Sequence, residues 1–191
     1  LDGDLDDGAL HRAGDRVAGR GSAGLLAGRA LRLLRRSRAA AANVAHAKQI
    51  LLETIEYAKE RKAFGQAIGS FQHNKFKLAE MVTAIEAAEP YVDDCIEAHS
   101  KGQLTAVDAA KAKWWSAQVQ NDVLDECVQL YGGYGFMNEY RVARAWRDAR
   151  VTKIWAGSNE IMKELIGRDL GLCPSRPRID LLVGLGTRRT D

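Results

Sequence analysis

The 191-residue sequence contains only three cysteines and three prolines, and it has no apolar run of the roughly 20 residues that a membrane-spanning helix needs. Cys95, Cys127 and Cys173 stand singly, without the spacing of disulfide partners or metal ligands. The aspartate-rich opening differs from the basic start of a signal peptide. These absences argue against a membrane span, a metal site and secretion, so a cytoplasmic location is the default expectation.

Positive charge is concentrated at the two ends of the chain. Residues 1–42 and 173–191 carry net charges of +3 and +2, which leaves −2 for residues 43–172 within the total of +3. A nucleic-acid groove would need clustered lysines and arginines on the folded surface. The mildly acidic middle therefore argues against a nucleic-acid partner.

The first 42 residues use only eight residue types and include seven glycines. Glycine at this density weakens a helix, and the composition offers little apolar surface to bury. We predict a disordered or poorly packed leader over residues 1–42 and an unstructured tail over 173–191. Because the composition changes abruptly at Asn43, we hypothesise a frameshifted or truncated reading upstream of that residue, with a similar origin for the tail.

From Asn43 onward, apolar residues recur at spacings of three and four, which is the period of one helix face. Glycine-containing turns divide this region into three long helices and two shorter ones. No strand pattern competes with the helical period. The sequence therefore predicts an all-α fold, an up-and-down four-helix-type bundle over residues 43–172.

Four residues shape the expected helix boundaries. Ser70, Thr105 and Ser158 each precede a predicted helix and are expected to act as N-caps, Thr105 together with Asp108. Pro90 lies within the second long helix, where a proline bends the axis, so we expect a kink near residues 87–89.

Arg61 and Phe64 lie at a predicted helix junction, and Gln72 follows in the next helix. The planar guanidinium of an arginine binds two oxygens at once, which suits a diphosphate. The alternative is an arginine that ends a helix and a phenylalanine in the core.

Two glycine-containing turns can each be interpreted either as a binding site or as an ordinary structural turn. A glycine cluster after a helix, as at residues 129–133, lets backbone N–H groups approach a phosphate, but it is also typical of a simple turn. Gly157 and Ser158 stand at a helix start, where free N–H groups and the helix dipole attract a carbonyl or phosphate oxygen. The alternative there is an ordinary N-cap.

Taken in order, the blocks RKAFG, SFQ, QLYGGYG, ARAWRDAR and IWAGSNEIMKELIGRDLGL resemble the C-terminal helical domain of the flavin-dependent acyl-CoA dehydrogenases. The resemblance covers residues 43–172 and is greatest to long-chain and isovaleryl-type members. It implies a FAD-dependent oxidoreductase of fatty acid β-oxidation. In this family a carboxylate removes the α-proton of an acyl-CoA, the β-hydrogen leaves as hydride to the flavin, and electrons pass to an electron-transfer flavoprotein.

The resemblance also assigns roles to individual residues. It implies FAD held across a subunit boundary, with Gly157 near the substrate. The positions that match FAD contacts are Arg61, Phe64, Gln72, Gln129, Leu130, Tyr131, Gly132, Gly133, Ser158, Asn159 and Glu160.

The chain departs from the family pattern where the catalytic carboxylate belongs. One family position for this base is Ala156, and the other falls near Arg35-Arg36, so no catalytic residue is assigned. The domains that precede the helical domain in the family are also missing from this sequence. We therefore expect a C-terminal fragment that is inactive alone and forms homo-oligomers, or hetero-oligomers with a fuller dehydrogenase chain. The alternatives are a non-catalytic FAD-contacting subunit and a helical scaffold without a ligand.

Overall fold

The structure is a computed structural model that describes residues 22–172, so the predictions for residues 1–21 and 173–191 lie outside the described residues. Helices dominate the described part, which confirms the all-α prediction. In chain order the elements are α2 (Ser22–Glu60), β1 (Lys62–Ala63), β2 (Gln66–Ala67), η1 (Ile68–Ser70), α3 (Gln72–Ser100), α4 (Ala106–Tyr131), η2 (Gly132–Phe136), α5 (Arg141–Ala149), η3 (Arg150–Lys153) and α6 (Asn159–Asp169).

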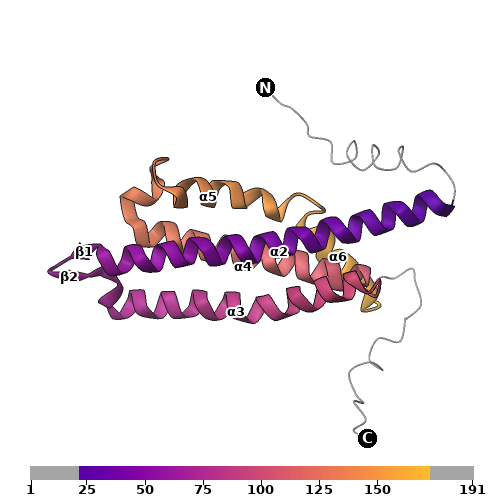
Figure 1. Ribbon diagram of the computed structural model, residues 1–191, viewed down its shortest axis with the longest axis horizontal. Coiled ribbons are helices and arrows are strands. Elements are labelled where there is room, and N and C mark those ends of the chain that lie inside the picture. Colours follow the sequence, from indigo (N-terminus) through magenta and orange to yellow (C-terminus); the bar gives the residue numbers. More distant parts are fainter. Residues whose placement is uncertain (1–21, 173–191) are drawn as a thin grey trace, which may run out of the picture.

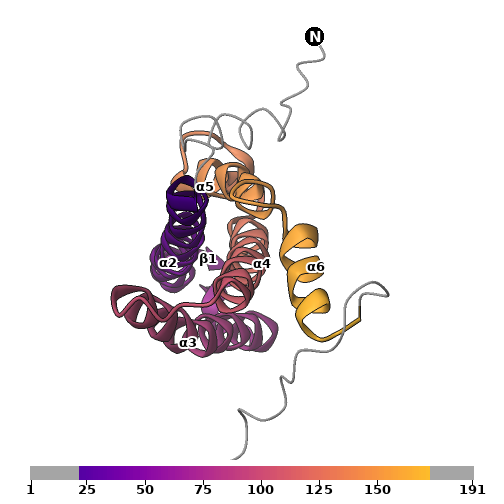
Figure 2. The same cartoon turned by 90° about the vertical axis from the view of Figure 1, so that its right-hand side faces the viewer.

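Three long helices form the body of the bundle, and α5 and α6 cover its sides. Figure 1 shows α2, α3 and α4 running lengthwise beside one another, with α5 above them. The end-on view of Figure 2 shows α6 on the outer side of α4. Helix α4 packs against α2, α3, α5 and α6, so it is the central helix of the bundle.

The first helix starts far upstream of the predicted boundary at Asn43. Helix α2 begins at Ser22 and continues without a break to Glu60, so the prediction of a disordered leader is wrong for residues 22–42. All seven leader glycines lie at or before Gly28, and the stretch that follows consists mostly of alanine, leucine and arginine, which are strong helix formers. Averaging the composition over 42 residues concealed this stretch.

A small hairpin joins α2 to α3, where the sequence predicted no strand. Strands β1 and β2 pair antiparallel over two residues each. The turn residues Phe64 and Gly65 both have positive φ, 52° and 82°, which is the backbone of a tight two-residue hairpin turn. Two-residue strands are too short to show any alternating pattern in a sequence.

Two of the three predicted caps are confirmed. The Thr105 hydroxyl accepts a hydrogen bond from the Asp108 N–H at 3.1 Å, and the Ser158 hydroxyl accepts one from the Ile161 N–H at 3.4 Å. The prediction for Ser70 is wrong, because this residue ends η1 and its hydroxyl donates to the Ala67 carbonyl oxygen. Helix α3 continues through Pro90 to Ser100.

The core lies between α2, α3 and α4, and its α4 side is partly polar. Buried residues of α4 recur with alternating spacings of four and three at Ala109, Lys113, Ser116, Gln120, Val123 and Cys127. Asn43 of α2 donates to the Ser116 hydroxyl at 3.2 Å inside this core. Within the described residues, no helix is both long enough and apolar enough to cross a membrane.

Candidate functional site

A groove of about 490 Å³ lies at the hairpin end of the bundle and brings two of the predicted blocks together. The Arg61 guanidinium lies 5.2 Å from the centre of the Tyr134 ring, a cation–π distance. Tyr57 and Tyr131 stack with their ring centres 3.9 Å apart. The groove is lined by Tyr57, Arg61, Ile68, Leu130, Tyr131, Gly132, Gly133, Tyr134 and Met137.

The glycines leave backbone exposed beside this arginine. Helix α4 ends because Gly132 turns to a φ of 60°, a conformation that side-chain-bearing residues rarely adopt. A Cβ added at Gly132 or Gly133 would meet no atom within 4 Å, so both face open space. At Gly135 a Cβ would lie 2.4 Å from the Val128 carbonyl oxygen, so this glycine allows the turn to close onto α4.

Three other predicted cofactor contacts surround this end of the bundle but do not line the groove. Phe64 sits at the hairpin tip and is 96% exposed, which rules out its alternative reading as a core residue. Its ring meets Phe71 edge-on at 6.3 Å. Gln72 and Gln129 are exposed at the first residue of α3 and in the last turn of α4.

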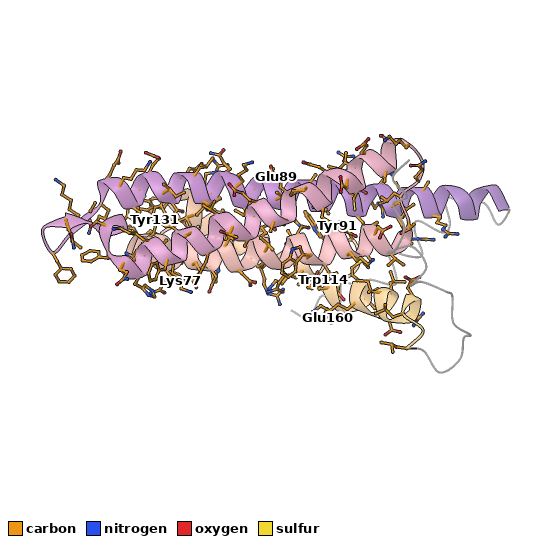
Figure 3. The ribbon with its side chains drawn as sticks, turned by 90° about the horizontal axis from the view of Figure 1, so that it is seen from below. Lys77, Glu89, Tyr91, Trp114, Tyr131 and Glu160 are labelled. Atoms are coloured by element: carbon orange, nitrogen blue, oxygen red, sulfur yellow. The ribbon has the colours of Figure 1, made fainter. Side chains whose placement is uncertain are left out.

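The third block, residues 156–160, lies away from this groove. Figure 3 places Tyr131 toward one end of the bundle and Glu160 beneath Trp114 toward the other. The α4 residues beside the two places, Lys113 and Leu130, are roughly 26 Å apart at the helical rise of 1.5 Å per residue. The predicted contact residues of a single chain therefore form two separate surfaces.

The turn before α6 is strained and tightly held. Ala156 and Gly157 both have positive φ, 56° and 97°. For an alanine this backbone costs about 1 kcal/mol or more. Asn159, which begins α6 and is 4% exposed, accepts a hydrogen bond from the Lys113 ammonium at 3.0 Å and donates to the Trp114 carbonyl oxygen at 3.4 Å.

Two positively charged side chains, Lys113 and Arg36, lie next to this turn. Lys113 is 0% exposed, and burial lowers its pKa from the ordinary 10.5 to about 8, a shift that Glu160 opposes and Arg36 reinforces. Burial, with a smaller contribution from Arg32, also lowers the pKa of Arg36. The Arg36 Nε atom is buried without a hydrogen-bond partner in the described part of the chain. Its Nη2 atom lies 4.0 Å from where a Cβ of Gly157 would stand.

The resemblance places the catalytic base at Ala156 or near Arg35-Arg36, and in the fold Arg36 lies beside the turn that contains Ala156. Neither position holds a carboxylate. Glu160 is nearby and exposed, but hydrogen bonds from its own backbone N–H and from Ser158 lower its pKa, which makes it a weaker proton acceptor. This turn can therefore offer N–H groups and positive charge to a ligand, but no strong base.

The sequence does not predict the burial of Lys113, because a lysine is not expected on the apolar face of a helix. The signal was available, since Lys113 and Gln120 continue the alternating spacing of the buried α4 residues. In the sequence, the only notable feature of Arg36 is that it stands where the resemblance expects a carboxylate nearby. Its contact with Gly157 joins residues 121 positions apart and has no local signature.

A larger groove of about 810 Å³ lies between α4 and the α5–η3 segment and holds none of the predicted site residues. Its α4 wall is acidic and already engaged, for example by the bond from the Trp146 Nε1–H to Asp125 at 2.9 Å. Its other wall carries Arg147, Arg150 and Lys153.

Comparison with known proteins places these features in context. Residues 27–171 match the acyl-CoA dehydrogenase C-terminal domain family. The mitochondrial long-chain specific acyl-CoA dehydrogenase of Sus scrofa is 48% identical over 118 residues, which are 62% of this chain and 27% of that protein. Subunit CarC of the caffeyl-CoA reductase-Etf complex of Acetobacterium woodii is 35% identical over 127 residues, 66% of this chain and 34% of that subunit.

The crystal structure of an acyl-CoA dehydrogenase from Geobacillus kaustophilus aligns with a TM-score of 0.74 and 39% identity, over 80% of this chain and 39% of that one. The chain thus spans between about a quarter and two fifths of the length of these relatives. The family match begins at residue 27, upstream of the boundary expected at Asn43.

Proposed function

Because this chain belongs to the acyl-CoA dehydrogenase family of FAD-dependent oxidoreductases, we propose that it is the helical flavin-holding and oligomer-forming part of such an enzyme. The observation that carries the proposal is the groove at the hairpin end, where Arg61 and the exposed backbone of Gly132 and Gly133 share one surface. The proposed substrate class is an acyl-CoA thioester, in keeping with the name of the long-chain relatives.

The groove suits the diphosphate half of FAD. Arg61 is exposed, and its fork of N–H donors matches phosphate oxygens. The exposed backbone of Gly132 and Gly133 lets a ligand approach closely, and the stacked Tyr57–Tyr131 pair provides an aromatic wall. In this proposal Phe64, Gln72 and Gln129 contact the cofactor from the rim of the groove.

The turn at residues 156–160 is proposed to contact the flavin ring and the thioester, where the reaction takes place. The bound flavin supplies a hydride acceptor, while Gly157 and Ser158 at the α6 start orient the thioester or flavin oxygens through backbone N–H groups. Since this turn and the groove lie at different places along α4, we propose that they serve two flavins across a subunit boundary. The exposed Glu160 completes the turn's proposed contact with the cofactor, whereas the buried Asn159 side chain is bonded to Lys113 and Trp114 and does not take part.

The lone chain is proposed to be catalytically inactive. General-base removal of an α-proton needs a carboxylate within hydrogen-bond reach, and the two positions at which the family resemblance places this base, Ala156 and near Arg35-Arg36, hold none. The electron acceptor of the complete enzyme is proposed to be an electron-transfer flavoprotein, in keeping with the name of the CarC complex.

The same absence of a base favours a second candidate function. In it the chain is a non-catalytic subunit that lends its FAD-contacting groove to a fuller dehydrogenase chain, which contributes the base. Both candidates require the groove to bind flavin, but only the second predicts flavin uptake that depends on the partner.

The test is a fluorescence titration of FAD with the purified chain, alone and mixed with a full-length homologue. Arg61→Ala is expected to weaken binding about tenfold, the effect of losing roughly 1.4 kcal/mol from a charge-assisted contact. Arg150→Ala, an exposed arginine of the other groove, is the matched control and should leave the affinity unchanged.

The three possible outcomes separate the candidates. Binding by the chain alone supports the first function, and uptake only in the mixture supports the second. No binding in either setting, or equal affinities for Arg61→Ala and wild type, would refute the flavin groove. Dehydrogenation of acyl-CoA by the lone chain would refute its proposed inactivity.

A further inference from the structure

Lys113 is an unusual residue to find in the centre of a helical bundle. It is 0% exposed, and no larger side chain in the described chain is fully buried. Its ammonium bonds the Asn159 amide oxygen, which is a neutral partner, and the nearest negative influence is the exposed Glu160. A buried charge without a carboxylate partner lowers the stability of the fold. Stability alone therefore does not account for a lysine here.

The bond from Lys113 leads to the one strained turn beside α6. A non-glycine residue with positive φ, as at Ala156, persists only where the surroundings hold it in place. Asn159, three residues later, is attached to α4 at both ends of its amide, to the Lys113 ammonium and to the Trp114 carbonyl oxygen. This side chain clamps the start of α6 to two consecutive residues of α4.

The alternatives for this position show what the charge contributes. A methionine of similar length would fill the same space without the cost of burying a charge, but it has no N–H donor for the Asn159 oxygen. The Asn159 amide would then keep only its 3.4 Å bond to Trp114 and leave its own oxygen buried without a partner. The ammonium is thus the group that determines the orientation of Asn159.

We propose that Lys113 is a positioning residue, whose buried ammonium fixes Asn159 and thereby the backbone of residues 156–158. The importance of this turn for substrate and flavin rests on the proposed function. The clamp itself does not, because it is formed by the chain's own residues. Arg36, which lies against Gly157 from α2, supports the same turn from the other side.

The experiment is amide hydrogen exchange on the full chain, without flavin, for Lys113→Met, Asn159→Ala and the double variant. The reporters are the Ile161 and Met162 amides, which bond Ser158 in the first turn of α6. Each single variant is expected to speed their exchange about tenfold, and the double variant no further, because both changes remove the same bond. Amides of α3 should not accelerate in any of these variants.

Two further variants make the result specific. Lys111→Met removes a lysine of the same helix that pairs with Asp108 instead, and it should leave the α6 amides unchanged. Asn159→Asp gives the ammonium a charged partner and should slow exchange at Ile161 and Met162. If Lys113→Met does not fold, Asn159→Ala and Asn159→Asp still report the clamp from its other end.

The proposal is overturned if the α6 amides exchange at the wild-type rate in Asn159→Ala, or if α3 and α6 amides accelerate equally. Additive effects in the double variant would also overturn it. Failure of the Arg61 titration would refute the flavin groove and leave these exchange results standing. The two proposals can therefore fail separately.

Discussion

The two ends of α4 support surfaces of opposite character. At its C-terminal end, Arg61, Gly132 and Gly133 line an open groove, and a Cβ added at either glycine would meet no described atom within 4 Å. Near its N-terminal end, Lys113 and Asn159 are buried, and the turn they hold is strained. The first surface is formed by exposed groups, and the second by buried groups that hold a turn in place.

Because of this difference, we expect substitutions on the two surfaces to have different effects on ligand binding and on stability. Exposed groups such as Arg61 and Gly133 make few contacts within the fold, so substituting them affects the ligand more than the fold. A buried cation and a strained turn each lower the free energy of unfolding. Such destabilising features are typical of sites whose geometry is needed for function. We expect substitutions at the groove to change affinity, and substitutions at the turn to change stability and local order.

The largest expected effect comes from the buried lysine at high pH. The pKa of Lys113 is about 8 in the fold and 10.5 in the unfolded chain, so the charged form destabilises the fold fully below pH 8. As the pH rises from 8 to 10.5 the penalty disappears, and stability should increase by up to about 3 kcal/mol. Lys113→Met should lack this gain and be more stable than wild type at pH 7.

The measurement is urea unfolding of both proteins at a series of pH values, because the difference between them isolates Lys113 from other groups that titrate in this range. Lys111→Met is the control and should retain the gain. Parallel stability curves for wild type and Lys113→Met would show that Lys113 is not the source of this pH dependence.

A smaller effect is expected at the closed side of the groove. Gly135→Ala should lower the free energy of unfolding by about 2 kcal/mol, because the new Cβ would collide with the Val128 carbonyl oxygen. Gly133→Ala, two residues earlier, points into open space and should be nearly neutral. Thermal unfolding of the two variants checks this contrast, and equal destabilisation would mean that the groove is not open at Gly133.

The smallest effect is expected at the strained turn. Ala156→Gly should raise the free energy of unfolding by about 0.5 kcal/mol, because relief of the positive φ slightly exceeds the entropy that a glycine adds to the unfolded chain. Ala156→Val should destabilise the protein instead, since a branched Cβ tolerates this backbone poorly. Denaturant midpoints measure both changes, and a stabilising valine would show that the turn is not strained.

Much of the fold was readable in the sequence because helix signals are local. Apolar spacing and glycines identified α3, α4 and α6, and Thr105 and Ser158 were recognised as caps because a cap bonds residues three positions away. The start of α2 was misplaced because seven glycines before residue 29 obscured a good helix-forming stretch. Ser70 was misassigned because η1 uses its hydroxyl.

For the candidate site too, features with a local sequence signal were predicted and features that depend on packing were not. The residue types at Arg61 and at 129–133 indicated an anion-binding surface, and the structure places Arg61 and residues 130–133 in one groove, with Gln129 outside it. The clamp at Lys113 was not anticipated, although its spacing on α4 was visible. A lysine is normally exposed, and only a partner helix can bury it.

By itself the sequence determined the helices, their caps, the glycine turns and the family, since these depend on residues within a few positions of one another or on their order along the chain. Tertiary structure alone decided that Arg36 lies against Gly157, that Lys113 is buried under α6, and that the two ligand-facing surfaces stand apart. These arrangements depend on how α2, α4 and α6 pack, and packing joins residues whose distance along the chain carries no information about their distance in space.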